Sequence, residues 1–187
     1  MGDRMIDRVL RIIRLDFTVF KEIESDPQAT TEAAIIVVVT TLLSALGSAI
    51  FADNPVTSFI VSVVSGLVGW VVWSVVTYFV GMSVFGGKGT LEGMVRVIGY
   101  ASAPNILGVF GIVPCIGWMA AFAGWLLALA AGILAVREGL DLSLGAAIGV
   151  VVIGWIAMVI ARGIIDIIFG GARAVGAGLL GLIRGTY

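Results

Sequence analysis

The first 30 residues mix apolar and charged positions with the spacing of a single helix. Apolar side chains recur three or four positions apart from Ile6 to Ile23, and charged side chains fall mainly on the other face. This period is typical of an amphipathic helix. We therefore predict that residues 1–30 form an amphipathic cytoplasmic or interfacial helix, with Phe17 and Phe20 shielded by lipid or protein. The alternative is a helix that packs on loops of its own protein.

After residue 31 the pattern changes to long apolar runs separated by short polar or glycine-rich breaks. A membrane-spanning helix needs about 20 mostly apolar residues. The runs predict an all-α, polytopic membrane helix bundle with about five transmembrane helices in a membrane domain over residues 31–169. The predicted spans are approximately 32–51, 56–85, 97–113, 118–136 and 144–169. Residues 170–187 are predicted to form an interfacial C-terminal tail.

The third predicted span is the irregular one. It is short, and Gly99, Pro104, Gly108 and Gly111 interrupt it. Proline removes a backbone hydrogen bond and disfavours helix at the residue before it. The segment is therefore either a kinked span or a re-entrant segment. We expect Gly99 to Pro104 to pack against the small residues of the second span.

Small residues at a spacing of about four suggest close helix packing in two spans. In membranes such residues let helix backbones approach one another. The candidate packing positions are Ser62, Gly66, Gly69, Gly145 and Gly149.

Composition excludes much soluble chemistry. Of the 187 residues, 60 % are hydrophobic and 12 % charged, against about a quarter charged in a typical soluble domain. Histidine is absent and Cys115 is the single cysteine, so histidine-based catalysis and Cys/His metal sites have no ligands. The net charge of −1 offers no field for nucleic acid. We predict no enzyme activity, no catalytic residue, no metal and no cofactor.

Basic residues predict the orientation. With five spans and the N-terminus inside, eight of the eleven basic residues lie on the inner side. Lys and Arg accumulate on the cytoplasmic side of membrane proteins. The expected topology is N-terminus cytoplasmic and C-terminus outside. A re-entrant third segment would move the C-terminus inside.

Ionisable residues within spans often mark transport pathways. Arg162 and Asp166 stand four apart near the end of the fifth span, where they are expected to form a structural ion pair. Spans one to four show no other charge at depth, which argues against transport.

The order of these parts resembles the Yip1 domain family. The third span opens with Arg96, Tyr100 and Pro104, similar to the family's Arg-x-x-x-Tyr-x-x-x-Pro pattern, and a Pro114…Gly117-Trp118 turn precedes span four. The Asp-Leu-Tyr-Gly-Pro-like motif of the eukaryotic members is missing. The resemblance therefore does not extend to the small-GTPase binding that it implies for those members. The chain looks like the shorter prokaryotic form, which implies an integral protein of a prokaryotic plasma membrane.

Arg96, Tyr100 and Pro104 share one helix face, at i, i+4 and i+8. They are candidate contacts for a partner or a lipid headgroup. The alternative is an interfacial Arg and Tyr anchor beside a proline kink.

Three functions remain open. The resemblance implies a non-enzymatic membrane protein that organises membrane or partner proteins. A small transporter, channel or lipid-moving protein is the alternative, because unwound helices often form substrate sites. An accessory subunit of a larger membrane complex fits the small-residue positions equally well. Expected partners are membrane lipids and other membrane proteins or a second copy of the chain, with no nucleic acid.

Overall fold

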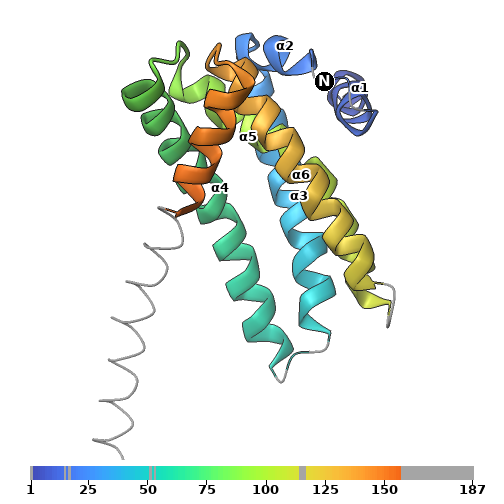
Figure 1. Ribbon diagram of the computed structural model, residues 1–187. Helices are drawn as coiled ribbons and strands as arrows, with labels where there is room; N and C mark the ends of the chain where they lie inside the picture. The colour runs from blue at the N-terminus through green and yellow to red at the C-terminus, as the bar shows by residue number, and fades with distance from the viewer. Residues whose placement is uncertain are drawn as a thin grey trace, which may run out of the picture.

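The computed structural model describes residues 2–14, 16, 18–50, 52, 54–113 and 117–156, and these are helical without strands (Figure 1). Three helices are long and apolar enough to cross a membrane, over Ala29–Gly47, Pro55–Phe85 and Gly117–Gly139. The predicted fold class, an all-α membrane helix bundle, is confirmed. The elements are α1 (Gly2–Ile13), α2 (Val19–Ser25), α3 (Ala29–Ala49), α4 (Pro55–Phe85), α5 (Leu91–Ala101), η1 (Ala103–Ile112), α6 (Gly117–Gly139) and a further helix over Leu144–Ile156.

The N-terminal region differs from the single predicted helix, because it is divided into α1 and α2. Between the two, one Asp16 carboxylate oxygen accepts the backbone N–H and the hydroxyl of Thr18, and the other binds Arg11 Nε at 2.8 Å. An aspartate that bonds the backbone two residues on favours a turn over continued helix. We call α1 and α2 together the platform. Figure 1 shows the platform at the end of the bundle where α3 begins.

Helix caps begin α4, α5 and the helix over Leu144–Ile156. The Asn54 side chain accepts the N–H of Thr57, and the Thr90 hydroxyl accepts that of Gly93. The Ser143 hydroxyl accepts the N–H of Ala146. Each cap satisfies a donor that has no partner within its helix.

The third predicted span consists of α5 followed by the 3₁₀ helix η1. Pro104 lies in the first turn of η1, where its missing N–H costs no helical bond. At about 1.5 Å per α residue and 2.0 Å per 3₁₀ residue, α5 and η1 together extend about 36 Å, comparable with the bilayer core. In Figure 1 the chain enters α5 at the platform end and reaches α6 at the opposite end. The segment is kinked where α5 meets η1 at Pro104, and it runs from the platform end of the bundle to the opposite end.

The glycine-rich turn after α4 is held by packing. Gly86 ends α4 at φ 65°, a left-handed conformation that glycine adopts without strain. Lys88 donates its N–H to the Leu140 carbonyl at 2.8 Å, and a Cβ on Gly89 would lie 2.3 Å from the Gly139 carbonyl oxygen. The turn therefore fixes the end of α4 against the end of α6.

Glycine contacts correct the expected packing of the kink. A Cβ on Gly124 of α6 would lie 2.7 Å from the Pro104 carbonyl oxygen and 2.9 Å from Leu107 Cβ. The kink is thus covered closely by α6. The second-span positions that were expected to cover it instead face α5 and η1 across a cavity.

The predicted small-residue positions divide into two kinds. Gly66 and Gly149 approach other helices closely, since a Cβ there would lie 2.5 Å from Thr41 Cγ2 and 2.8 Å from Phe85 Cζ. A Cβ on Gly69 or Gly145 would meet nothing within 4 Å, so the close packing expected at these two positions was wrong.

This contrast predicts opposite effects of alanine at two positions of one helix. Gly66→Ala should destabilise the protein by about 1–2 kcal/mol, because Thr41 must shift. Gly69→Ala should stabilise it by about 0.5–1 kcal/mol, because alanine favours helix and meets no neighbour. Thermal unfolding in one detergent compares the two, and equal melting temperatures would contradict the α3–α4 contact described.

Candidate functional site

A buried arginine joins the platform to the bundle. Arg8 of α1 is 3 % exposed although it lies on the predicted polar face. Its Nη2 donates to Glu22 and to Asp26, each at 2.8 Å, and its Nη1 donates to Glu32 Oε2 at 2.8 Å. One guanidinium therefore links α1 to α2, to the α2–α3 turn and to the first turn of α3.

Glu32 extends this cluster into the spans. Its Oε2 also accepts the hydroxyl of Tyr100 in α5 at 2.5 Å, and both residues are fully buried. The other oxygen, Oε1, is buried without a donor among the described residues. We call Arg8, Glu22, Asp26, Glu32 and Tyr100 the Arg8 cluster. It ties α1, α2, α3 and α5 together where α3 enters the membrane.

Arginine suits this position because its planar guanidinium donates in several directions and stays charged. Burial alone would lower the pKa of Arg8, but its hydrogen bonds to Asp26 and Glu22 outweigh burial and raise that pKa. The hydrogen bond from Arg8 holds the pKa of Asp26 and that of Glu22 below their usual values, despite partial burial. The Asp26 and Glu22 carboxylates therefore stay ionised at neutral pH beside the charged Arg8 guanidinium.

These pKa shifts predict how the platform responds to acid. Carboxylates with lowered pKa values stabilise the folded state above their unfolded pKa, about 4, and this stabilisation is lost as pH falls through the folded values. We expect platform stability to be flat from pH 8 to 5 and to decline below about pH 4. Thermal unfolding against pH measures this. Arg8→Met should remove most of the acid-dependent loss, and a decline already between pH 7 and 5 would contradict the assignment.

Arg96 and Tyr100, predicted to contact a partner or a lipid headgroup, instead serve internal contacts. Arg96 donates from Nε to the Thr30 hydroxyl at 2.7 Å and from Nη1 to the Glu24 carbonyl at 2.8 Å. Tyr100 points at Glu32 and is not an interfacial anchor. Pro104, the third member, is buried in η1. The three therefore do not form one outward-facing contact surface.

Other predicted positions cannot be placed. Arg162, Asp166 and Cys115 lie outside the described residues, as does Phe17. Phe20 is fully buried by protein in α2, one of the two outcomes expected for it.

A second feature of the bundle is a cavity of about 680 Å³ between α3, α4 and the α5–η1 crossing. Gly66, Gly69, Trp70 and Trp73 form its α4 side. Thr40, Thr41 and Ser44 of α3 and Ser102 and Asn105 opposite them supply polar groups. It is partly open to the outside of the bundle.

No group of His, Cys, Asp and Glu that could hold a metal was found in the described part of the chain. Within the Arg8 cluster, the Arg8 guanidinium donates hydrogen bonds to the Glu22, Asp26 and Glu32 carboxylates, and Glu32 Oε1 is the buried oxygen left without a donor among the described residues. The arrangement can hold helices in place, and the cavity can hold a guest. Neither presents an exposed nucleophile with a base.

Sequence reasoning missed the Arg8 cluster. A glutamate in the first turn of a long apolar span is costly unless it is paired, and that signal pointed to Glu32. Arg4, Arg8 and Arg11 also lie on one edge of α1, which is complementary to the acids that follow at Glu22 and Asp26. The prediction that spans one to four hold no charge at depth is wrong for Glu32, which is fully buried in the first turn of α3.

The helical membrane bundle, with its surface platform and a kinked crossing at Pro104, defines a polytopic integral membrane protein. The model of the Yip1 domain matches residues 15–165, and the chain belongs to the Yip1 family. No curated protein and no solved structure matches it.

Proposed function

We propose that the protein acts without catalysis, as an organiser of the membrane or of partner proteins around it, with its platform on the cytoplasmic side of a prokaryotic plasma membrane. The family assignment and the eight-to-three distribution of basic residues support this proposal. The observation that carries the proposal is that Arg8 fixes α1 beside α3 while apolar side chains of α1 stay exposed.

One edge of α1 is fixed to the protein and another faces outward at bilayer level. Arg8 holds the basic edge, whereas Ile6, Leu10 and Ile13 are about half exposed. These three residues and Ile35 and Val39 of α3 line a common apolar groove of about 250 Å³.

This shared groove supports a position of α1 beside the hydrocarbon of the bilayer. The Ile35–Val39 stretch lies two to three turns into a membrane-crossing helix, so the groove adjoins the acyl chains of one leaflet. An amphipathic helix fixed at this level adds area to one leaflet only. That is a physical means of organising a membrane without chemistry.

Reconstituted vesicles test this role. Wild-type protein in phosphatidylcholine vesicles should decrease vesicle diameter as the protein-to-lipid ratio rises. The variant Ile6→Ser/Leu10→Ser should not, because both side chains are exposed and their loss leaves the Arg8 cluster intact. The matched control Asp3→Ser/Asp7→Ser alters the solvent edge of α1 and should behave as wild type. Equal vesicle sizes for all three proteins would refute the proposal.

The orientation has its own test. A reporter fused after Tyr187 should give an external signal, and a cytoplasmic signal would refute the five-span topology.

The second candidate is a lipid-moving protein or small transporter, and the cavity is the observation in its favour. This second function requires the protein to move a ligand across the membrane as well as to bind it. A lipid-scrambling assay with a fluorescent phospholipid distinguishes it, since an organiser leaves the scrambling rate at that of empty vesicles.

A further inference from the structure

The chemistry of the cavity between α3, α4 and α5–η1 restricts what can occupy it. Among the described residues that line it, none is charged, and six have hydroxyl or amide side chains: Thr40, Thr41, Ser44, Ser62, Ser102 and Asn105. A charged ligand group would lose its hydration there and find no opposite charge. The occupant is therefore uncharged.

The hydrogen-bond donors of the cavity lining restrict the chemical class of the occupant further. A serine or threonine hydroxyl has one proton to donate and lone pairs to accept. Thr40 donates to the Ile36 and Val37 carbonyls, Ser44 to the Asn105 carbonyl, and Ser102 to the Gly99 carbonyl.

These hydrogen bonds hold the hydroxyl protons of Thr40, Ser44 and Ser102 on backbone carbonyls. With their protons committed, Thr40, Ser44 and Ser102 can only accept hydrogen bonds from a ligand. A ligand that bears a hydroxyl supplies the donor, whereas an ether or ester does not. The hydroxyl oxygen can in turn accept from the Asn105 amide.

The rest of the lining is apolar and wide. Val37, Trp70, Trp73 and Ile98 form much of the wall, and a Cβ on Gly69 would meet nothing within 4 Å. The cavity lies beside the middle of α4, at the depth of the acyl chains. The available guests at that depth are lipids.

We infer that this cavity binds an uncharged amphiphile that carries a hydroxyl, such as a long-chain alcohol or an acylglycerol. The hydroxyl lies among Thr40, Ser44, Ser102 and Asn105, and the hydrocarbon chain lies against the tryptophans. This binding does not depend on the organising role proposed above.

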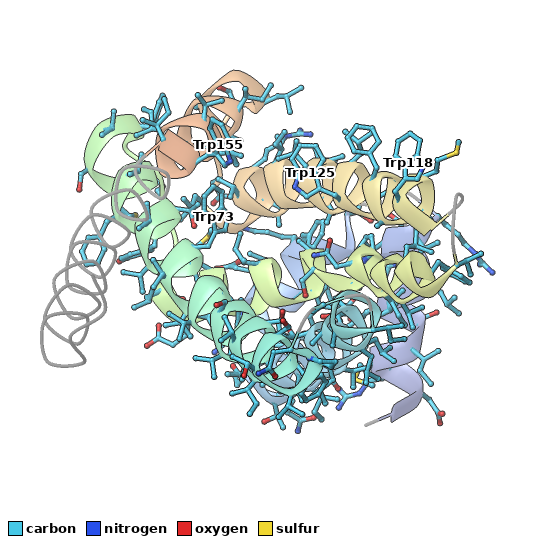
Figure 2. The ribbon with its side chains drawn as sticks, turned by 90° about the horizontal axis from the view of Figure 1, so that it is seen from below. Trp73, Trp118, Trp125 and Trp155 are labelled. Atoms are coloured by element: carbon cyan, nitrogen blue, oxygen red, sulfur yellow. The ribbon has the colours of Figure 1, made fainter. Side chains whose placement is uncertain are left out.

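The tryptophans provide a readout. Trp70 and Trp73 line the cavity, whereas Trp118, Trp125 and Trp155 do not line it and are more than half exposed. Figure 2 shows Trp118 and Trp125 on the outer side of α6, away from Trp73 on α4. A protein in which these three are replaced by phenylalanine reports on the cavity alone.

The experiment measures quenching of Trp70 and Trp73 by three chain-brominated probes, in nanodiscs of unbrominated phosphatidylcholine. The probes are stearyl alcohol, its methyl ether and its sulfate ester. We expect saturable quenching by the alcohol and about fivefold weaker binding of the ether, which lacks one hydrogen bond. The sulfate should bind more weakly still.

Two glycines give a matched pair of variants. Gly69 lines the cavity and a Cβ there would meet nothing within 4 Å, so Gly69→Leu should fill part of the cavity and abolish the saturable quenching. Gly132→Leu adds the same side chain to α6, where a Cβ also meets nothing within 4 Å, and should leave it unchanged. Melting temperatures show that both variants are folded. As a second route, Asn105→Ala should weaken the binding of the alcohol and of the ether to a similar degree, because either oxygen accepts from the Asn105 amide.

The inference is overturned if the alcohol quenches Gly69→Leu and Gly132→Leu to the same extent. The quenching would then come from probe dissolved in the surrounding bilayer. Equal affinities for the alcohol and its ether would overturn the assigned hydroxyl. Neither result bears on vesicle diameter, so a failure here is distinguishable from a failure of the proposed organising role.

Discussion

Arg8→Met is expected to release α1 from the rest of the protein and to destabilise the protein by about 3–5 kcal/mol. Removing one partner of a buried ion pair leaves the other charge uncompensated, which costs far more than the pair itself is worth. Here the stranded charge is Glu32, which is fully buried and already has one oxygen without a donor. Thermal unfolding in detergent measures the loss of stability, and limited proteolysis near residue 16, between α1 and α2, reports the release of α1.

Arg14→Met is the matched control. Arg14 lies just after α1, is exposed, and has no side-chain partner within the part of the chain that the structure describes. It should melt as wild type does. The double variant Arg8→Met/Glu32→Gln should recover part of the lost stability, since the buried charge is then gone. A strictly additive double variant would show that Arg8 does not stabilise through Glu32.

The Arg8 cluster also shows where sequence patterns stop being informative. Periodicity placed Arg8 on the polar face of a helix, which is correct, but the pattern does not reveal what that face meets. Its partner Glu32 is 24 positions away. The division between α1 and α2 turns on one side chain, Asp16, whose local bonds compete with the helix that the apolar spacing predicts.

The long apolar runs were informative because a membrane requires every backbone group to be satisfied within a helix. That constraint predicts the spans α3, α4 and α6 from apolar length alone, and Pro104 marked the irregular crossing. The apolar pattern does not show which glycine of a span contacts a neighbouring helix. Gly66 and Gly69 lie three residues apart on α4, yet only Gly66 approaches Thr41. The difference depends on where α3 crosses α4, which no local pattern encodes.

Gly124→Ala is expected to destabilise the protein by about 2–3 kcal/mol. The added methyl group would lie 2.7 Å from the Pro104 carbonyl oxygen and 2.9 Å from Leu107 Cβ. Neither atom can move by a change of rotamer, because one belongs to the backbone and the other is attached to it. Relief requires α6 to move away from η1, and overpacking of this kind costs free energy.

Gly132→Ala, two turns further along α6, separates this clash from the general effect of alanine in a helix. A Cβ there meets nothing within 4 Å, so the substitution should stabilise the protein by about 0.5–1 kcal/mol. Thermal unfolding of the two variants in one detergent gives the difference. Adding Pro104→Ala to Gly124→Ala tests the cause: a straightened crossing should move the carbonyl away from α6 and reduce the loss. Equal melting temperatures for Gly124→Ala and Gly132→Ala would contradict the close contact of α6 with the kink.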